Sequence, residues 1–325
     1  MHGPRIGNAM ALHVPSAVSA SRRRGGYILA ATGAILFSMK AILVKLAYGQ
    51  GSVPQADAIT LLALRMAFSL PFYAVVGIMG LRAHTARGLP LPSGRLAIET
   101  VLVGFLGYYL SSYLDFAGLQ YLSAQLERLI LMTYPVFVAL LGAAFFGARL
   151  TLCGLAALFV AYSGIVFIFA EGATAKGGNV ALGAFLVFCA SFTYALYQLI
   201  ARPLVAAIGT RLFTSIAMLA ACAGVMLHYA ATNSLNQLVQ ASPRVLGLSA
   251  VMAIASTVLP SFMISAALER VGAQAVSMIG TVSPVATIVM AMAFLDEPFT
   301  AADAAGTALV IAGIGLFTYQ DARRH

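Results

Sequence analysis

The sequence predicts an all-α integral membrane protein with ten transmembrane helices, arranged as two inverted repeats of five helices each. Three observations lead to this prediction. Of the 325 residues, 61% are hydrophobic and only 9% are charged, whereas ordinary soluble domains carry about 25% charged residues. The apolar residues gather in runs of membrane-spanning length, and part of the first half of the chain recurs in the second half without a gap.

Ten apolar runs are long enough to cross a membrane. A helix needs about 20 apolar residues to cross a hydrocarbon core about 30 Å thick. The expected spans are residues 26–47, 57–80, 96–118, 122–146, 150–170, 179–200, 211–230, 244–267, 272–295 and 301–319. The strand-like alternation of a transmembrane barrel is not found in the sequence.

Basic residues are distributed unequally between the two sides of the predicted membrane. With the N-terminus in the cytoplasm, 13 Lys and Arg residues fall in cytoplasmic segments and three fall in external segments. Cytoplasmic loops carry an excess of Lys and Arg, so we expect both termini to lie in the cytoplasm. The expected location is the plasma membrane, such as the bacterial inner membrane. The placement of the basic residues that give the formal net charge of +9 thus predicts an orientation in a lipid bilayer. We expect no nucleic-acid partner.

An internal repeat supports the division into halves. Residues 108–169 align with 257–318 at a constant offset of 149, with 15 identities over 62 positions. Five spans per half is an odd number, so the second half begins on the opposite side, and such inverted repeats build secondary transporters with a site near the midplane. The expected division is a cytoplasmic tail 1–25, a first repeat 26–170, an external linker 171–178, a second repeat 179–319 and a cytoplasmic tail 320–325.

Two matched segments resemble a known family. The segments TYPVFVALLGAAFFGARLT and VSPVATIVMAMAFLDEPFT are similar to the paired fourth- and ninth-helix signatures of the drug/metabolite transporter superfamily, and more narrowly of its ten-helix EamA-type members. The resemblance covers residues 26–319 and implies a secondary carrier, often an exporter, of small solutes such as amino acids, sugars or nucleotide-linked metabolites. The family usually has an acidic residue after the fourth helix. Here that position is Ala148, whereas its repeat partner Glu297 keeps the acid.

Four ionisable side chains fall within the spans, namely Lys40, Arg65, Glu127 and Arg128. Intramembrane charges usually face a cavity and mark a pathway. All four come from the first repeat, and their formal charges sum to +2. We therefore expect an anionic group of a substrate, such as a carboxylate or a phosphate, to balance them. The structural alternative pairs Arg65 with Glu127 between helices two and four, while Lys40 reaches external water by snorkelling.

Glu127 is the leading candidate for proton coupling, and Asp115 is the second. Burial can bring the protonation of a carboxylate into the physiological range, although a neighbouring Arg opposes this. The chain has no GxxxxGK[ST] nucleotide-binding loop. The expected driving force is therefore a proton gradient or exchange of substrates.

Prolines and polar side chains near the middle of the spans extend the candidate site. Pro135 and Pro284 lie at the midpoints of spans four and nine, where they are either hinges or fixed kinks. Tyr134, Tyr194 and Gln198 are expected to line the pathway. For the tyrosines the alternative is an ordinary position in the interfacial belt or the core.

The remaining motifs argue against other classes of protein. No GxSxG or HExxH motif and no CxxC pair occurs, and His228 has no evident partner. We therefore expect no enzymatic activity, no cofactor, no metal site and no disulfide. Small residues in spans five and ten predict close helix packing or a homodimer. A passive channel and a non-transporting membrane scaffold are the alternatives to a carrier, but a channel would need a continuous polar stripe.

Overall fold

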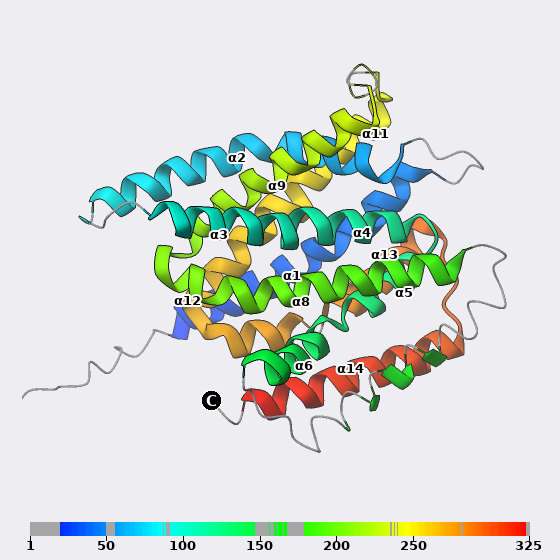
Figure 1. Ribbon diagram of the computed structural model, residues 1–325. Helices are drawn as coiled ribbons and strands as arrows, with labels where there is room; N and C mark the ends of the chain where they lie inside the picture. The colour runs from blue at the N-terminus through cyan, green and yellow to red at the C-terminus, as the bar shows by residue number, and fades with distance from the viewer. Residues whose placement is uncertain are drawn as a thin grey trace, which may run out of the picture.

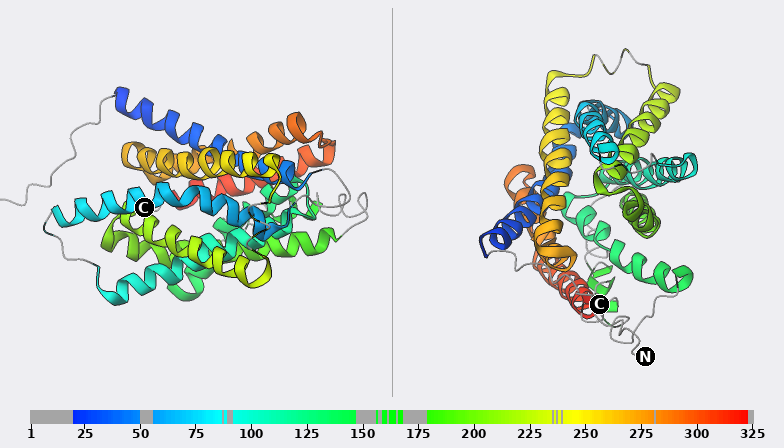
Figure 2. Two further views of the ribbon diagram at one scale, coloured as in Figure 1. Left: turned by 90° about the horizontal axis from the view of Figure 1, so that it is seen from above. Right: turned by 90° about the vertical axis from the view of Figure 1, so that its left-hand side faces the viewer.

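The computed structural model describes residues 20–49, 56–86, 88, 92–146, 179–234, 236, 238, 240–280 and 282–322, with a few helical residues between 156 and 167. These residues form helices that run side by side in a bundle (Figures 1 and 2), and no strand occurs among them. The prediction of an all-helical membrane fold is confirmed.

The helices of the first half are α1 (Ala20–Tyr48), α2 (Ala58–Ala86), α3 (Gly94–Gly104), η1 (Phe105–Leu110), α4 (Ser111–Leu119), α5 (Ala124–Leu131) and α6 (Tyr134–Phe146). Those of the second half are α8 (Val180–Ile208), α9 (Thr210–Thr232), α11 (Pro243–Ala253), η2 (Ile254–Val258), α12 (Leu259–Gly280), α13 (Val282–Leu295) and α14 (Ala301–Ala322). The segments η1 and η2 are π-helical, and each continues the helices on either side of it.

Seven segments of the described residues are long and apolar enough to cross a membrane: Arg23–Tyr48, Ala58–Ala86, Gly94–Leu119, Ala124–Phe145, Val180–Ile208, Thr210–Thr232 and Pro243–Ile264. Val282–Leu295 and Ala301–Gly313 are shorter apolar helices. Most of the expected fifth span, the linker 171–178 and residues 1–19 and 323–325 lie outside the described residues. Ten helices in two inverted halves therefore stay a prediction.

Short polar side chains fix where several helices begin. The hydroxyl oxygens of Ser93, Ser123 and Ser242 each accept a hydrogen bond from the backbone N–H three residues later, at 3.2–3.3 Å. Thr300 and Asp303 cap α14 reciprocally, since each side chain accepts a hydrogen bond from the backbone N–H of the other. Such caps satisfy N–H groups that have no partner within the helix.

Two irregularities recur at the offset found in the sequence. The capping serines Ser93 and Ser242 are 149 residues apart, and so are Phe105 and Ile254, the first residues of the two π-helical segments. A π-helical turn inserts a residue into a helix and is rare. Its presence at matched positions supports the repeat more strongly than identities between apolar residues do.

Two helices extend beyond the expected spans. Helix α1 already begins at Ala20, within the expected tail. The expected loop at 268–271 is also helical, because α12 runs without a break to Gly280 and α13 begins at Val282. The matching positions of the first half do contain a break, and the local hydrogen bonds described below explain the difference.

The buried core and the outer surface are both apolar. The main core is formed by α1, α2 and α4 with residues of α9 and α11, and it includes Phe116 and Tyr229, both fully buried. On the outside, Leu102 is 63% exposed and Phe185 is 62% exposed. Large apolar side chains exposed in this way are expected where lipid, and not water, surrounds the protein.

Candidate functional site

Lys40, Asp115 and Glu127 form a buried ionic cluster that joins three helices of the first half. The ammonium group of Lys40 on α1 contacts Oδ2 of Asp115 on α4 and lies 3.3 Å from Oε1 of Glu127 on α5. The three residues are 6%, 3% and 0% exposed. A buried charge is costly unless it is paired, and here one cation stands between two carboxylates.

The alternative in which Arg65 pairs with Glu127 is not found within the described part of the chain. The ion-pair partner of Glu127 is Lys40, which is buried and does not snorkel toward water. Arg65 on α2 instead places its guanidinium 4.8 Å from the ring centre of Phe116, and its Nε atom is buried without a hydrogen-bond partner. The sequence placed both Arg65 and Lys40 in the outer halves of their spans, and only the packing decides which cation is nearer to Glu127.

Arg128 reaches across to the second half of the molecule. Its Nη2 atom donates a hydrogen bond to the hydroxyl oxygen of Ser283 on α13, and that oxygen lies 2.5 Å from the hydroxyl oxygen of Ser38 on α1. Because a guanidinium can only donate, the Ser283 hydroxyl is free to donate to Ser38. The hydroxyl of Ser38 in turn donates a hydrogen bond to the carbonyl oxygen of Ala34 at 2.8 Å. One chain of hydrogen bonds thus joins α5, α13 and α1.

The guanidinium of Arg128 has no carboxylate within ion-pair distance among the described residues. The salt bridges found there join Lys40 to its two carboxylates and Arg95 to Glu99 at the surface. The Nε atom of Arg128 is also buried without a partner, and its Cζ atom lies 5.5 Å from the ring centre of Phe37. An aromatic face stabilises a cation only partly, so Arg128 keeps an unsatisfied capacity to bind an anion.

Asp115 corrects the expected charge balance. From the sequence, Asp115 was expected near the outer end of span three. It was therefore not counted in the formal charge of +2 within the spans. In the structure it contacts Lys40, so the buried ionisable side chains described in the first half are three cations, Lys40, Arg65 and Arg128, and two carboxylates, Asp115 and Glu127. The formal excess is therefore one positive charge, which a single monoanionic group would balance.

Helix α5 is held at its N-terminus by the second half. The carboxylate of Glu297, in the turn after α13, accepts hydrogen bonds from the backbone N–H groups of Ala124, at 2.8 Å, and Gln125, at 3.4 Å. The amide of Gln125 donates to the carbonyl oxygen of Pro298 at 3.3 Å. A carboxylate at this position satisfies free N–H groups and complements the helix dipole. The retained acid of the family motif therefore positions the helix that carries Glu127 and Arg128.

Pro135 follows a break in the fourth span and does not bend a continuous helix. The break lies at Met132 and Thr133, between α5 and α6, and Pro135 is the second residue of α6. Because Pro135 has no N–H group, the carbonyl oxygen of Leu131 loses its helical donor. The hydroxyl of Ser191 on α8 donates to that oxygen at 3.2 Å. Pro284 is likewise near the start of α13.

The tyrosines that were expected to line the pathway belong to an aromatic cluster. Tyr134 and Tyr194 pack edge to face with ring centres 5.2 Å apart, and Tyr194 stacks on Tyr197 at 5.7 Å. The hydroxyl of Tyr197 donates to that of Tyr108 at 2.9 Å. Gln198 lies close to the hydroxyl groups of Tyr134 and Tyr194. The structure thus brings together all three residues expected on the inner pathway, and it adds two tyrosines.

His228 does have a partner, contrary to the expectation from sequence. Its Nδ1 atom lies 3.0 Å from the hydroxyl oxygen of Tyr109, and the ring of Tyr113 packs against it with centres 4.8 Å apart. This group joins α9 to η1 and α4, away from the charged cluster. The sequence gave no sign of it because the residues lie more than a hundred positions apart.

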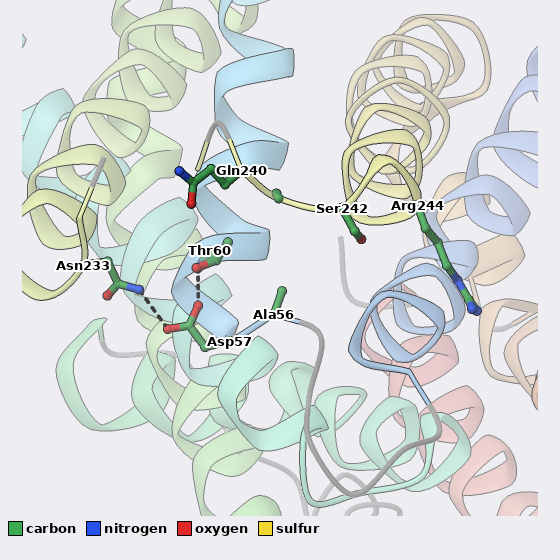
Figure 3. A pocket seen from close by; sticks show the side chains of 8 residues that line it. Ala56, Asp57, Thr60, Asn233, Gln240, Ser242 and Arg244 are labelled. Atoms are coloured by element: carbon green, nitrogen blue, oxygen red, sulfur yellow. Dashed lines mark hydrogen bonds between the residues drawn. The ribbon is translucent and has the colours of Figure 1, made fainter. Parts of the chain in front are cut away.

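The larger described pocket lies at one end of the bundle and is separate from the charged cluster. It has a volume of about 740 Å³ and is lined by residues at the start of α2, the end of α9 and the start of α11, including Asp57, Asn233 and Arg244. Figure 3 shows that the carboxylate of Asp57 accepts hydrogen bonds from the side-chain amide of Asn233 and from the backbone N–H of Thr60. A smaller apolar pocket of about 280 Å³ lies beside Ile130 and Phe188. Neither lining includes Lys40, Glu127 or Arg128, so the charges are packed together in this arrangement.

Comparisons with known proteins identify the family of this chain. The model of the EamA-like transporter family matches residues 24–170 and 181–319. "Uncharacterized transporter YcbK" of Bacillus subtilis (strain 168) is 29% identical over 280 residues, which cover 84% of this chain and 86% of that protein. "Uncharacterized transporter YyaM" of the same organism is 25% identical over 221 residues, covering 67% and 72%.

A solved structure described as "Crystal structure of protein" has a similar fold. It superposes with a TM-score of 0.61, covering 93% of this chain and 99% of that chain. The sequence identity is 17%, so this likeness concerns the fold alone.

Proposed function

Because this chain belongs to the EamA-like transporter family, we propose that it is a secondary transporter that moves a small anionic or zwitterionic metabolite, such as an amino acid, by alternating access. It is a multi-pass membrane transporter, as the family and the transporter-named relatives indicate. The substrate class, the direction and the driving force are the parts proposed here. The direction that we propose is export.

The unpaired guanidinium of Arg128 is the observation that carries the substrate class. It is 3% exposed, its Nε atom has no partner among the described residues, and the five buried ionisable side chains described in the first half have one excess positive charge. Arg binds carboxylates and phosphates through paired N–H groups. A substrate carboxylate on Arg128 would balance the charge and complete its hydrogen bonds.

The position of Arg128 between the halves supports alternating access. Helix α5 belongs to the first half by sequence, but it contacts Ser283 and Glu297 of the second half at its two ends. A relative movement of the halves would therefore change the surroundings of Arg128. We propose two inverted five-helix repeats that rock about this region, in a bacterial plasma membrane with both termini cytoplasmic. Self-association as a homodimer is part of the same proposal.

Glu127 is proposed as the proton-coupling residue and Asp115 as its alternative. Both carboxylates contact Lys40, so a change in their protonation would change the only ion pairs of the described cluster. Exchange of one substrate for another is the second way to drive transport. In that case the cycle would depend on a counter-substrate and not on pH.

Counterflow in reconstituted vesicles tests the function. Vesicles that contain the purified protein are loaded with one unlabelled L-amino acid at a time, and entry of the same labelled amino acid is measured. A carrier gives a transient accumulation that saturates with concentration, whereas a channel gives only equilibration. Monocarboxylates and phosphorylated metabolites form the comparison set. Transport of lipophilic cations alone would overturn the proposed substrate class.

A further inference from the structure

We infer that the carboxylates of Asp115 and Glu127 form a subsite for a primary ammonium group of the substrate, and that Lys40 occupies this subsite when no substrate is bound. This inference rests on the proposed function and narrows it to zwitterions. It assigns Lys40 a role in specificity, since a substrate must replace the ammonium group that the protein itself supplies.

The first support is the composition of the cluster. One ammonium group contacts two carboxylates, so the three side chains carry a formal excess of one negative charge. Arg65 and Arg128 are buried nearby, but among the described residues neither forms an ion pair with these carboxylates, which both contact the one ammonium group. The cluster therefore has the composition of an ammonium-binding site and not of a simple salt bridge.

The second support is the set of unsatisfied oxygen atoms. Oδ1 of Asp115 and Oε2 of Glu127 are buried and accept no hydrogen bond from a donor group of the described residues, and the two carboxyl groups lie close to each other. A buried acceptor without a donor is unfavourable, and the ammonium group of a ligand would supply the missing donors. Each carboxylate thus uses one oxygen for Lys40 and leaves the other available.

The third support is the neighbouring guanidinium. Arg128 follows Glu127 directly on α5, and its buried Nε atom is a donor without an acceptor. An unpaired acceptor and an unpaired donor on adjacent residues match the ammonium and carboxylate groups of an α-amino acid. The carboxylate would bind Arg128, and the ammonium group would bind Glu127 and Asp115.

The charge balance favours replacement of Lys40 over addition to it. With Lys40 in place, three cations face two carboxylates. If a zwitterion enters and Lys40 withdraws toward water, Arg65 and Arg128 face two carboxylates and the buried charge is zero. A zwitterion added beside Lys40 would leave the excess charge unchanged, which is unfavourable in a medium of low polarity.

Chemical rescue tests the subsite without any need to know the substrate. In Lys40→Ala the missing atoms correspond to propylammonium, and in Lys40→Met they correspond to ammonium. We expect propylammonium chloride to raise the melting temperature of K40A by about 2–4 °C relative to sodium chloride, and ammonium chloride to do so for K40M. The parent protein and K40A/E127Q are expected to show no such rise.

Lys45→Ala is the matched control. Lys45 is on the same helix, but its ammonium group donates to the carbonyl oxygens of Leu119 and Leu122. Propylammonium should therefore stabilise K45A less than K40A. An equal rise in the two variants, or no rise in either K40A or K40M, would overturn the subsite.

The parent protein supplies a further test that requires no variant. Each L-amino acid that is transported is compared with its 2-hydroxy acid, which lacks the ammonium group. The subsite predicts that the hydroxy acid competes at least about tenfold less well, and equal competition would contradict it. Rescue without any amino-acid transport would keep the subsite and overturn the proposed substrate class. Amino-acid transport without rescue would keep the function and overturn the subsite.

Discussion

The two halves of the molecule differ most clearly at one pair of matched positions. In the first half the chain breaks after α4 at Leu119 and resumes as α5 at Ala124. In the second half the matching positions, 268 and 273, lie within α12, which is continuous from Leu259 to Gly280. The two segments align without a gap, so length does not account for the difference.

Capping groups account for the break in the first half and for the continuous helix in the second. In the first half Ser123 and Glu297 accept hydrogen bonds from the first N–H groups of α5, and Lys45 donates to the carbonyl oxygens on either side of the break. In the second half the counterpart of Ser123 is Gly272 and that of Glu297 is Ala148. Within a membrane, helix ends need such partners. Where partners are missing from the sequence, the helix remains continuous.

The same comparison locates the chemistry. Asp115, Glu127 and Arg128 have the counterparts Ile264, Val276 and Ser277. The half that contains the broken helix therefore also contains the charges, because the break creates the short helix α5 that presents two of them. The backbone repeat is shared, and the ionisable side chains are confined to one copy.

The largest effect is expected from Arg128→Ala, which removes a buried cation that has no ion-pair partner among the described residues. Removing one partner of a buried charged contact costs about 2–5 kcal/mol, so transport of an amino acid should fall at least about 30-fold. Uptake into reconstituted vesicles measures this effect. Arg95→Ala, which removes an exposed arginine paired with Glu99, is the control, and equal losses in the two variants would show that Arg128 has no special role.

The next effect concerns pH and is expected from Glu127→Gln. If Glu127 couples transport to protons, the variant should transport at nearly the same rate at about pH 6 and about pH 8, whereas the parent should not. Initial rates in vesicles with a set internal pH provide the measurement. Glu99→Gln, at the surface, should keep the profile of the parent. An unchanged pH profile in E127Q would leave Asp115 or exchange as the basis of coupling.

A smaller effect is expected from the cap of α5. Glu297→Ala leaves the N–H groups of Ala124 and Gln125 without their acceptor, and loss of an N-terminal cap costs about 1 kcal/mol. We expect a lower melting temperature and faster amide exchange in α5. Ala148→Glu is the matched change in the other half, and it should have no effect because the N–H groups of α12 bond within the helix. Stabilisation by A148E would contradict our explanation of the difference between the halves.

The smallest effect is expected from Ser191→Ala. This variant removes the donor to the carbonyl oxygen that Pro135 leaves free, and such a hydrogen bond contributes about 1 kcal/mol. Thermal denaturation is the measurement. Thr193→Ala is the control, since its hydroxyl bonds to carbonyl oxygens of its own helix. If T193A destabilised the protein as much as S191A, the hydroxyl of Ser191 would have no particular role at the break.

The sequence by itself determined the membrane class, the positions of most spans, the repeat offset and four of the five buried charges described in the first half. Composition and hydrophobic run length specify these properties directly, because the bilayer imposes a fixed length and tolerates few charges. The offset of 149 recurs in the helix caps and π-helical turns because they are made by local sequence.

Only the tertiary structure decided which charges are paired and which helix is broken. Lys40, and not Arg65, reaches Glu127, and Glu297 caps a helix that begins 173 residues earlier in the chain. These contacts depend on how helices distant in sequence pack side by side. Hydrophobic periodicity fixes that a helix is buried, but the neighbour that a buried polar atom meets is set by the packing of the whole bundle.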